Sequence, residues 1–419
     1  MGNTLLLDPV QVLKGPEQEV EQGAVFIDHG VLSGFNQAAR TQAERCGVTR
    51  TEASRMLIAP CLVDPHSVLE SPFSGPTETL QSLKRCAASG GYGQIALLPR
   101  SSTWRDRPDR LSAFIQTDPD SVFVHVWGSF SRDGLGHDLA PHGDQLEHGA
   151  IGLAEDDAML QLPLLDRGLL LAEMGEAPVL LAPRDTALQD AGMVREGVET
   201  LRAGWTPDPL SSESLPVSQL LALQRRHPQR NLRLMNLSTA DAVEQLGREA
   251  KPPLASVCWW HLISDSHAMG SSDPGWRVRP SIGAASDRQS LQSAVIQGLI
   301  AAISVHAVPR DSEDMLLPPD QRPPGLSGHH LVLPALWDAF VRRGACNIAE
   351  LWKALSFGPS KLLNQPAEQL HLGSRRWLLF DPDQTWTVDR ADPASPASAN
   401  LPWLGQTIRG RVTACGLNH

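Results

Sequence analysis

The sequence feature that most constrains the fold is a series of eight short apolar runs spread along the chain. The runs are Ile58–Val63, Gln94–Leu98, Val122–Trp127, Ala150–Ala154, Pro178–Ala182, Leu232–Leu237, Ala255–Trp259 and Ile300–Val305. Apolar residues follow one another without a regular polar alternation, which is typical of parallel strands covered on both faces. Eight such strands, mostly about 25–50 residues apart, predict an α/β fold, a (β/α)8 TIM-type barrel.

Helical patterns lie between several of these runs. Residues Thr77–Ser89 carry apolar side chains on one face, and the glycines Gly90 and Gly91 favour an end to that helix. Asp287 is predicted to be the N-cap of a later helix. Asn347 and Glu350 have the spacing of a capping box at the start of another.

The two ends of the chain have a different pattern from the middle. Short stretches such as Ala24–Ile27 and Trp377–Phe380 are separated by Gly and Asp, which is typical of hairpin strands. We therefore expect a small β-sandwich domain formed from residues 1–57 and 372–419, and a barrel formed from residues 58–371.

Composition excludes several classes of protein. The chain has 419 residues and a formal net charge of −11, which argues against general binding to nucleic acid or to an anionic membrane. No apolar run reaches the ~18 residues needed to span a bilayer. The start of the chain has no basic region followed by an apolar core, so we expect no secretory signal. Six scattered cysteines fit reduced thiols and a cytoplasmic location.

The segment Ala59–His66, Ala-Pro-Cys-Leu-Val-Asp-Pro-His, resembles the first-strand signature of class I dihydroorotases in the amidohydrolase superfamily, Pro-Gly-x-x-Asp-x-His-x-His-x-Arg. Further family motifs follow in the family's order at Gly90–Gly91, Leu237–Ala240, Trp260–Leu262, Arg279–Pro280, Val305–Ala307, Phe380–Pro382, Trp386–Asp389, Asn400–Pro402 and Arg409–Val412. The resemblance covers nearly the whole chain. It implies the barrel and the small β domain, and a zinc-dependent hydrolysis of a cyclic amide.

The metal-ligand positions implied by the resemblance are mostly altered. The family uses a first-strand histidine pair, a bridging carboxylate, two further histidines and an aspartate. The residues at these places are His66 and Val68, then Glu155 or Asp156, then Ala182, Asn236 and Val305. Only His66 and Asp156 remain as metal-binding or catalytic candidates. Val and Ala donate nothing to zinc, so we expect an incomplete site and no bound cofactor.

The substrate-anchoring positions are altered too. The resemblance implies an arginine followed by two asparagines, and this chain has Glu70, Arg100 and Arg279 there. Glu70 would repel a carboxylated substrate.

Alternatives remain open for the histidines. His66 is either a structural imidazole or a residual ligand. A one-residue shift in the alignment would put His306 in place of Val305. A relocated metal site would have to use His125, His137, His142 and His148, and we favour a flexible loop there. His329 and His330 are interpreted as packing residues or as the start of a helix.

Two functions follow from this pattern. The first is a catalytically inactive, dihydroorotase-like protein of pyrimidine biosynthesis that acts as scaffold or regulator. For that role the resemblance implies an oligomer with aspartate carbamoyltransferase as partner, because inactive homologues hold that enzyme in a large assembly. The second is an active zinc-dependent dihydroorotase, or a related cyclic amidohydrolase, that hydrolyses a cyclic amide C–N bond.

Overall fold

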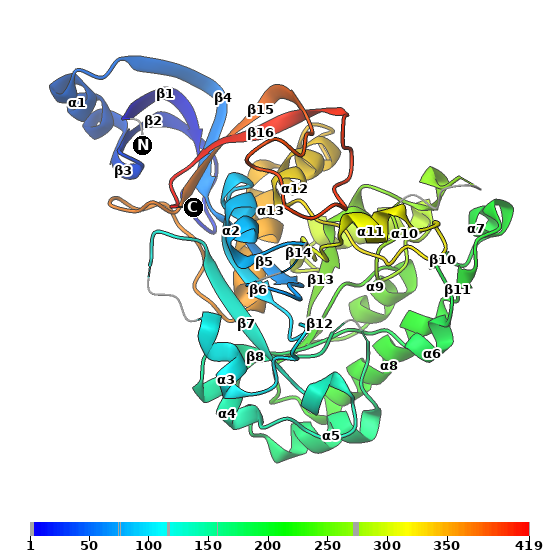
Figure 1. Ribbon diagram of the computed structural model, residues 1–419. Coiled ribbons are helices and arrows are strands. Elements are labelled where there is room, and N and C mark those ends of the chain that lie inside the picture. Colours follow the sequence, from blue (N-terminus) through cyan, green and yellow to red (C-terminus); the bar gives the residue numbers. More distant parts are fainter. Residues whose placement is uncertain are drawn as a thin grey trace.

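Eight parallel strands form the barrel that the sequence predicts (Figure 1). The computed structural model describes residues 4–73, 75, 77–114, 118–156, 158–270 and 276–418. In the order in which they pair, the strands are β14 (Ala302–Ser304), β13 (Leu254–Cys258), β12 (Leu232–Leu234), β9 (Val179–Leu181), β8 (Ala150–Ala154), β7 (Phe123–Ser129), β6 (Tyr92–Leu97) and β5 (Leu62–Ser67). The apolar runs therefore indicated the fold correctly.

The first predicted strand is displaced. Residues Ile58–Pro60 belong to the other sheet, as the end of β4 (Arg50–Pro60), and the first barrel strand begins only at Leu62. The chain passes from one sheet into the next with only Cys61 between them. Both segments are buried, so hydrophobicity gives no sign of the boundary.

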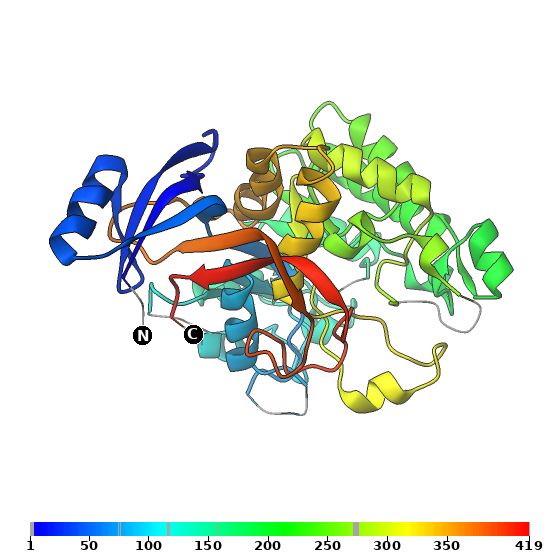
Figure 2. The same cartoon turned by 90° about the horizontal axis from the view of Figure 1, so that it is seen from above.

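Helices lie around the barrel strands (Figure 2). Beside the strands of the barrel, the described helices of eight or more residues are α2 (Leu80–Ser89), α5 (Leu162–Leu171), α8 (Ser211–Arg226), α9 (Ala240–Gly247), α10 (Ala285–Ile296) and α12 (His329–Leu336). Shorter ones are α3 (Pro108–Leu111), α4 (His142–Glu147), α6 (Thr186–Gln189), α7 (Val198–Ala203), α11 (Ser312–Leu316), α13 (Ile348–Trp352) and α14 (Gly358–Leu362). Two short strands, β10 (Val194–Arg195) and β11 (Pro207–Asp208), pair with each other outside the barrel.

The predicted helix signals are right in two cases and wrong in one. Helix α2 ends at Ser89 with Gly90 as its C-cap, and α13 has the capping box of Asn347 and Glu350. Asp287 is not an N-cap, because α10 begins two residues earlier with Ala284 as its N-cap. The Asp287 carboxylate instead accepts the N–H groups of Ala284 and Ala240, both at 2.8 Å, and so ties α10 to α9.

Both ends of the chain contribute to a second, six-stranded sheet. Its order is β16 (Thr407–Cys415), β15 (Trp377–Thr387), β4, β1 (Leu5–Val12), β2 (Glu21–Asp28) and β3 (Val31–Phe35). Helix α1 (Asn36–Cys46) follows β3. Strand β15 pairs antiparallel with β4, which is the strand that leads into the barrel. The C-terminal strands therefore belong to the same sheet as the N-terminal strands.

The barrel closes between β5 and β14 largely through side chains. The Val68 N–H donates to the Ala307 carbonyl at 2.7 Å. Asp64 Oδ1 accepts the Val305 N–H at 3.0 Å, and the Ser67 hydroxyl accepts the Ala307 N–H at 2.8 Å. Asp64 Oδ2 accepts the Ser67 hydroxyl, and His329 Nε2 from α12 lies 3.0 Å from the same oxygen. Asp64 is fully buried, so its carboxylate depends on these donors.

Across the parts of the chain that the structure describes, we find no helix with the length and apolar character needed to cross a membrane.

Replacing Asp64 by alanine should weaken the barrel at this closure. The substitution leaves buried donors on Val305, Ser67 and His329 without their acceptor, which costs about 1–3 kcal/mol for each donor. We expect the free energy of unfolding, measured by urea denaturation, to fall by about 3–5 kcal/mol in total. The matched control is Asp338→Ala, since half of the Asp338 side chain is exposed and it forms ion pairs with Arg342 and Arg343. Equal stability of the two variants would contradict this account of the closure.

Candidate functional site

The candidate site is the mouth of the barrel at the carboxyl ends of its strands, where barrel enzymes place their chemistry. His66 comes from β5, and Arg100 follows β6. Asn236 follows β12, while Ser256 lies in β13 and His306 follows β14. Residues far apart in the sequence are therefore brought to one end of the barrel.

His66 is fully buried, and both of its ring nitrogens are engaged within the protein. Its Nε2 lies 2.8 Å from the Ser256 hydroxyl, and its Nδ1 lies 3.1 Å from Nδ1 of His306. The Asn236 N–H donates to the same Ser256 hydroxyl at 3.0 Å. Burial, and next the neighbouring His306, hold the pKa of His66 well below its usual value. His66 is therefore a neutral, hydrogen-bonded imidazole at neutral pH.

The other positions that the resemblance assigns to metal binding are filled by packing. Val68 and Ala182 belong to one buried apolar cluster, and Val305 is buried in the main core. Asn236 accepts a hydrogen bond from the Ser304 hydroxyl through Oδ1 at 2.8 Å. None of the three apolar side chains has an atom that can bind a metal.

The two candidate carboxylates have partners of their own. Glu155 is buried and accepts the Ser131 N–H at 2.5 Å, and burial raises its pKa to about 8. A carboxyl group that is protonated near neutral pH is a poor metal ligand. Asp156 Oδ2 lies 3.1 Å from Nη1 of Arg100 in an ion pair.

The residues that the structure describes do not supply the set of donors that a zinc ion needs. Such a site needs three or four donors at about 2 Å. Among the residues described, no three His, Cys, Asp or Glu side chains are grouped closely enough to hold a metal ion. The two residual candidates have separate interactions, since His66 bonds to Ser256 and His306 whereas Asp156 pairs with Arg100.

The described histidines in and after β7 do not gather into a relocated metal site. His125 bonds to Gln94 at 2.9 Å, His142 to the Phe130 carbonyl at 2.7 Å, and His148 to the Asp144 carbonyl at 2.8 Å. His137 is exposed on the intervening loop.

His329 and His330 begin α12, in agreement with one of the predicted interpretations. The sequence did not indicate that His329 also bonds to Asp64 across the barrel closure.

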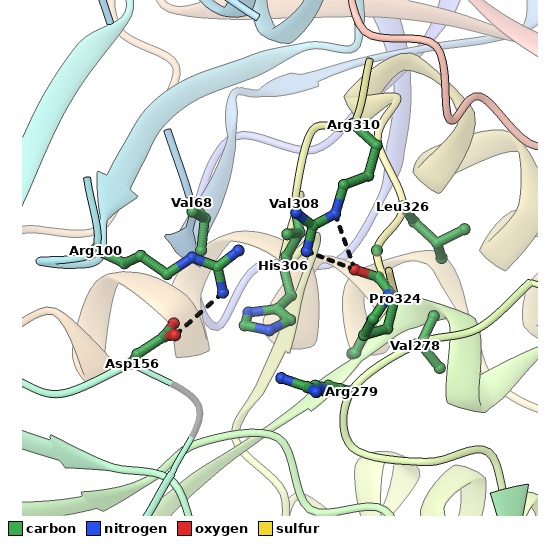
Figure 3. A pocket seen from close by; sticks show the side chains of 12 residues that line it. Val68, Arg100, Asp156, Val278, Arg279, His306, Val308, Arg310, Pro324 and Leu326 are labelled. Carbon is green, nitrogen blue, oxygen red and sulfur yellow. Dashed lines mark hydrogen bonds and ion pairs between the residues drawn. The ribbon is translucent and has the colours of Figure 1, made fainter. Parts of the chain in front are cut away.

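Arginines surround the pocket at the mouth (Figure 3). The side chains of Arg100 and Arg279 point into the same space beside the ring of His306, and Arg310 approaches from another side. The remaining lining residues are Val68, Asp156, Cys258, Val278, Val308, Pro324, Gly325 and Leu326. The cavity open to the centre of a water molecule is about 20 Å³.

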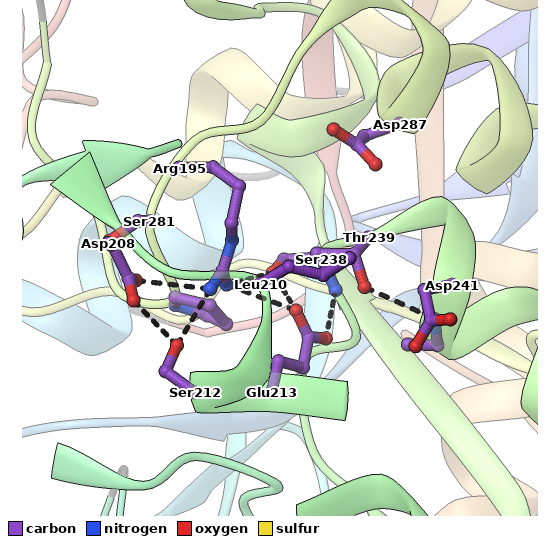
Figure 4. Close-up of polar contacts among 12 residues, drawn as sticks. Arg195, Asp208, Leu210, Ser212, Glu213, Ser238, Thr239, Asp241, Ser281 and Asp287 are labelled. Carbon is purple, nitrogen blue, oxygen red and sulfur yellow. Dashed lines mark hydrogen bonds and ion pairs between the residues drawn. The ribbon is translucent and has the colours of Figure 1, made fainter. Parts of the chain in front are cut away.

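A second polar cluster, which the sequence did not indicate, is buried beside the barrel (Figure 4). Arg195 lies 3.2 Å from Asp208 and 3.1 Å from Glu213. It also donates to the hydroxyls of Ser212 and Ser238. The cluster ties β10, β11 and α8 to the loop after β12. One buried arginine lies between two buried carboxylates, and burial raises the pKa of Glu213; this is the arrangement of a structural ion-pair network.

Comparison with known proteins places these features in a family. A scan against protein-family models gives no match. A probable dihydroorotase-like protein from Synechocystis sp. is 32% identical over 393 residues, covering 86% of this chain and 88% of that protein. A dihydroorotase from Pelotomaculum thermopropionicum is 27% identical over 400 residues, covering 94% of this chain and 92% of that enzyme.

Solved structures show the same fold at low sequence identity. Dihydropyrimidinase from Brevibacillus agri superposes with a TM-score of 0.76 at 18% identity, covering 98% of this chain and 93% of that chain. L-Hydantoinase from Arthrobacter aurescens gives a TM-score of 0.75 at 15% identity, with 97% and 93% covered. The sequence likeness to the Synechocystis protein shows that the chain belongs to the family of dihydroorotase-like proteins.

Proposed function

We propose that this protein is a member of its family without hydrolytic activity, in which the barrel is retained as a structural or regulatory unit of pyrimidine biosynthesis. One observation carries the proposal. His66 is the histidine retained from the first-strand signature, and hydrogen bonds to Ser256 and His306 engage both of its ring nitrogens.

The chemistry of the family explains why this observation matters. Hydrolysis of a cyclic amide requires a strongly activated water, a polarised carbonyl and a group that moves a proton. Bound metal supplies the first two of these in a metal-dependent amidohydrolase. Val68, Ala182 and Val305 occupy the ligand positions, and their buried side chains have no donor atom for a metal. Loss of several coupled members of a site lowers the rate by orders of magnitude.

The partner in this proposal is aspartate carbamoyltransferase. Support comes from the family resemblance, in which inactive homologues hold that enzyme in an assembly. A scaffold of this kind needs an intact barrel and no metal centre. The core, the closure at Asp64 and the second sheet are all compatible with that requirement.

The second candidate function is a zinc-dependent cyclic amidohydrolase, either a dihydroorotase or a related enzyme. Relatives named dihydroorotase match across more than nine-tenths of the chain, which favours this alternative. The two functions differ in whether a metal is required.

Metal content separates the two functions directly. We expect the purified protein, loaded with excess zinc and then desalted, to retain much less than one zinc per chain by elemental analysis. We also expect no hydrolysis of dihydroorotate or dihydrouracil above the rate without protein. The four-fold variant Val68→His, Ala182→His, Asn236→His, Val305→Asp restores the donors that the resemblance implies, and it should retain more zinc if it folds. One or two zinc ions in the unaltered protein, together with hydrolysis that a chelator abolishes, would overturn the proposal.

The protonation state of His66 provides a second test. Because its pKa is lowered in the folded protein, the ring should stay neutral from pH 8 to pH 5. The ¹⁵N chemical shifts of its ring nitrogens should therefore stay constant over that range. The exposed His29 is the control for a ring in contact with solvent.

The lowered pKa of His66 also affects the stability of the folded protein. In the unfolded chain His66 takes up a proton below about pH 6.5, and in the folded protein it does not. Relative to His66→Gln, the protein should lose about 1.4 kcal/mol of unfolding free energy per pH unit as the pH falls below 6.5. A midpoint near neutral pH in the His66 shifts would contradict the buried, hydrogen-bonded state.

The partner is tested by co-purification. Mixed at micromolar concentration, the protein and aspartate carbamoyltransferase from the same cells should elute together at a larger size than either one alone. His66→Ala should leave the complex intact, because that side chain is buried inside the barrel. Separate elution at all concentrations, or loss of the complex in a folded His66→Ala variant, would refute the scaffold role as stated.

A further inference from the structure

The strongest unexplained feature of the molecule is the set of guanidinium groups around the mouth cavity. Arg100 follows β6, Arg279 precedes α10, and Arg310 follows β14. They surround a space whose floor includes the ring of His306 (Figure 3). We propose that this cavity binds a phosphate-type oxyanion, either inorganic phosphate or the phosphate group of a small monoester. The inference adds a ligand to the proposed non-hydrolytic barrel.

Two of the guanidinium groups are held in place by the protein. Arg100 pairs with Glu70 at 2.7 Å and with Asp156 at 3.1 Å, and only 17% of its side chain is exposed. Arg310 donates to the Pro324 carbonyl through Nε at 3.2 Å and through Nη2 at 3.0 Å. Side chains fixed in this way lose little conformational freedom when a ligand binds.

The charge of the cavity favours an anion. Three arginines line it, and Asp156 is the single acidic side chain among the described lining residues. Burial lowers the pKa of Arg310, and the positive charges of Arg100 and Arg279 lower it further, while Glu70 and Asp314 act in the opposite direction. The guanidinium groups therefore repel one another, and a dianion between them would relieve that repulsion.

The size of the cavity suits a tetrahedral oxyanion. A space of about 20 Å³ for the centre of a water molecule has the volume of a sphere that admits a ligand of about 3 Å radius. That is the size of a phosphate or sulfate group. A tetrahedral oxyanion presents oxygens in all directions, and the arginines approach from several sides. A planar carboxylate presents two oxygens on one side, which suits a single guanidinium group.

The altered anchoring positions are consistent with a changed ligand. Glu70 stands where the resemblance implies an arginine, and Arg100 and Arg279 stand where it implies asparagines. Glu70 bonds to Arg100, so its charge orients a guanidinium group on the neighbouring strand end. Arg310 adds a third guanidinium group from the segment that follows β14.

The test is a calorimetric titration with inorganic phosphate at constant ionic strength and with EDTA present throughout. We expect saturable binding to the unaltered protein. Arg279→Ala should weaken it about ten-fold or more, because a charged hydrogen-bond donor is lost. Arg279 is exposed, so this variant should fold normally. The control is Arg202→Ala, another exposed arginine, which should bind like the unaltered protein. Arg100→Lys should also weaken binding, although it keeps the charge, because lysine lacks the planar fork of donors.

Further ligands identify the source of the oxyanion. Tighter binding of ribose 5-phosphate than of inorganic phosphate would support a phosphate monoester, and the reverse order would support the free ion. Three results would overturn the inference. They are no binding at about 10 mM phosphate, equal affinity of the Arg279→Ala and Arg202→Ala variants, and tighter binding of succinate than of phosphate. Because EDTA is present, none of these results depends on zinc, so failure here is distinct from failure of the proposed function.

Discussion

The carboxylate of Asp64 is the interaction on which the rest of the barrel mouth depends. It accepts hydrogen bonds from the last strand, from its own strand and from helix α12, and so closes the barrel with side-chain contacts as well as backbone pairing. In a chain with metal ligands nearby, this end of the barrel would have to hold several polar side chains open toward a metal. Here Asp64 accepts the Val305 N–H and His66 is hydrogen-bonded to Ser256 and His306, so these polar groups are engaged with one another inside the protein.

The chain of hydrogen bonds beyond that closure determines what the mouth can do. Asn236, Ser256, His66 and His306 are linked in order, and Ser304 bonds to Asn236. Polar residues buried in this way contribute specificity to the core, whereas a metal ligand needs a lone pair directed at the metal. The mouth therefore combines a hydrogen-bonded interior with arginines around its cavity, and the positive charges there are the feature on which the proposed anion site rests.

The barrel could be predicted from the sequence because a parallel strand buried on both faces is a short run of consecutive apolar residues. The prediction misplaced the first strand at Ile58, where two buried strands follow each other with only Cys61 between them. It placed Asp287 as an N-cap, because the pattern of an acidic residue before an apolar helix face does not distinguish the N-cap from the first turn.

The candidate site was predictable in part. The positions of His66 and Asp156, and the apolar replacements at Val68, Ala182 and Val305, follow from a linear comparison with the family motifs. The contacts of Asp64 with Val305 and His329 join residues 241 and 265 positions apart, and nothing in a local pattern specifies them. The position of His306 beside His66, and of Arg310 beside Arg100 and Arg279, likewise depends on how the strands are arranged around the barrel.

The most direct test of the central claim is the location of metal in crystals of the protein soaked in zinc, mapped by anomalous scattering at the zinc absorption edge. The account predicts that His66 keeps its hydrogen bonds to Ser256 and His306, with no anomalous peak in the barrel mouth. A peak bonded to a ring nitrogen of His66, in place of the hydrogen bond of that nitrogen to Ser256 or His306, would show that the metal centre survives in altered form. That result would contradict the account.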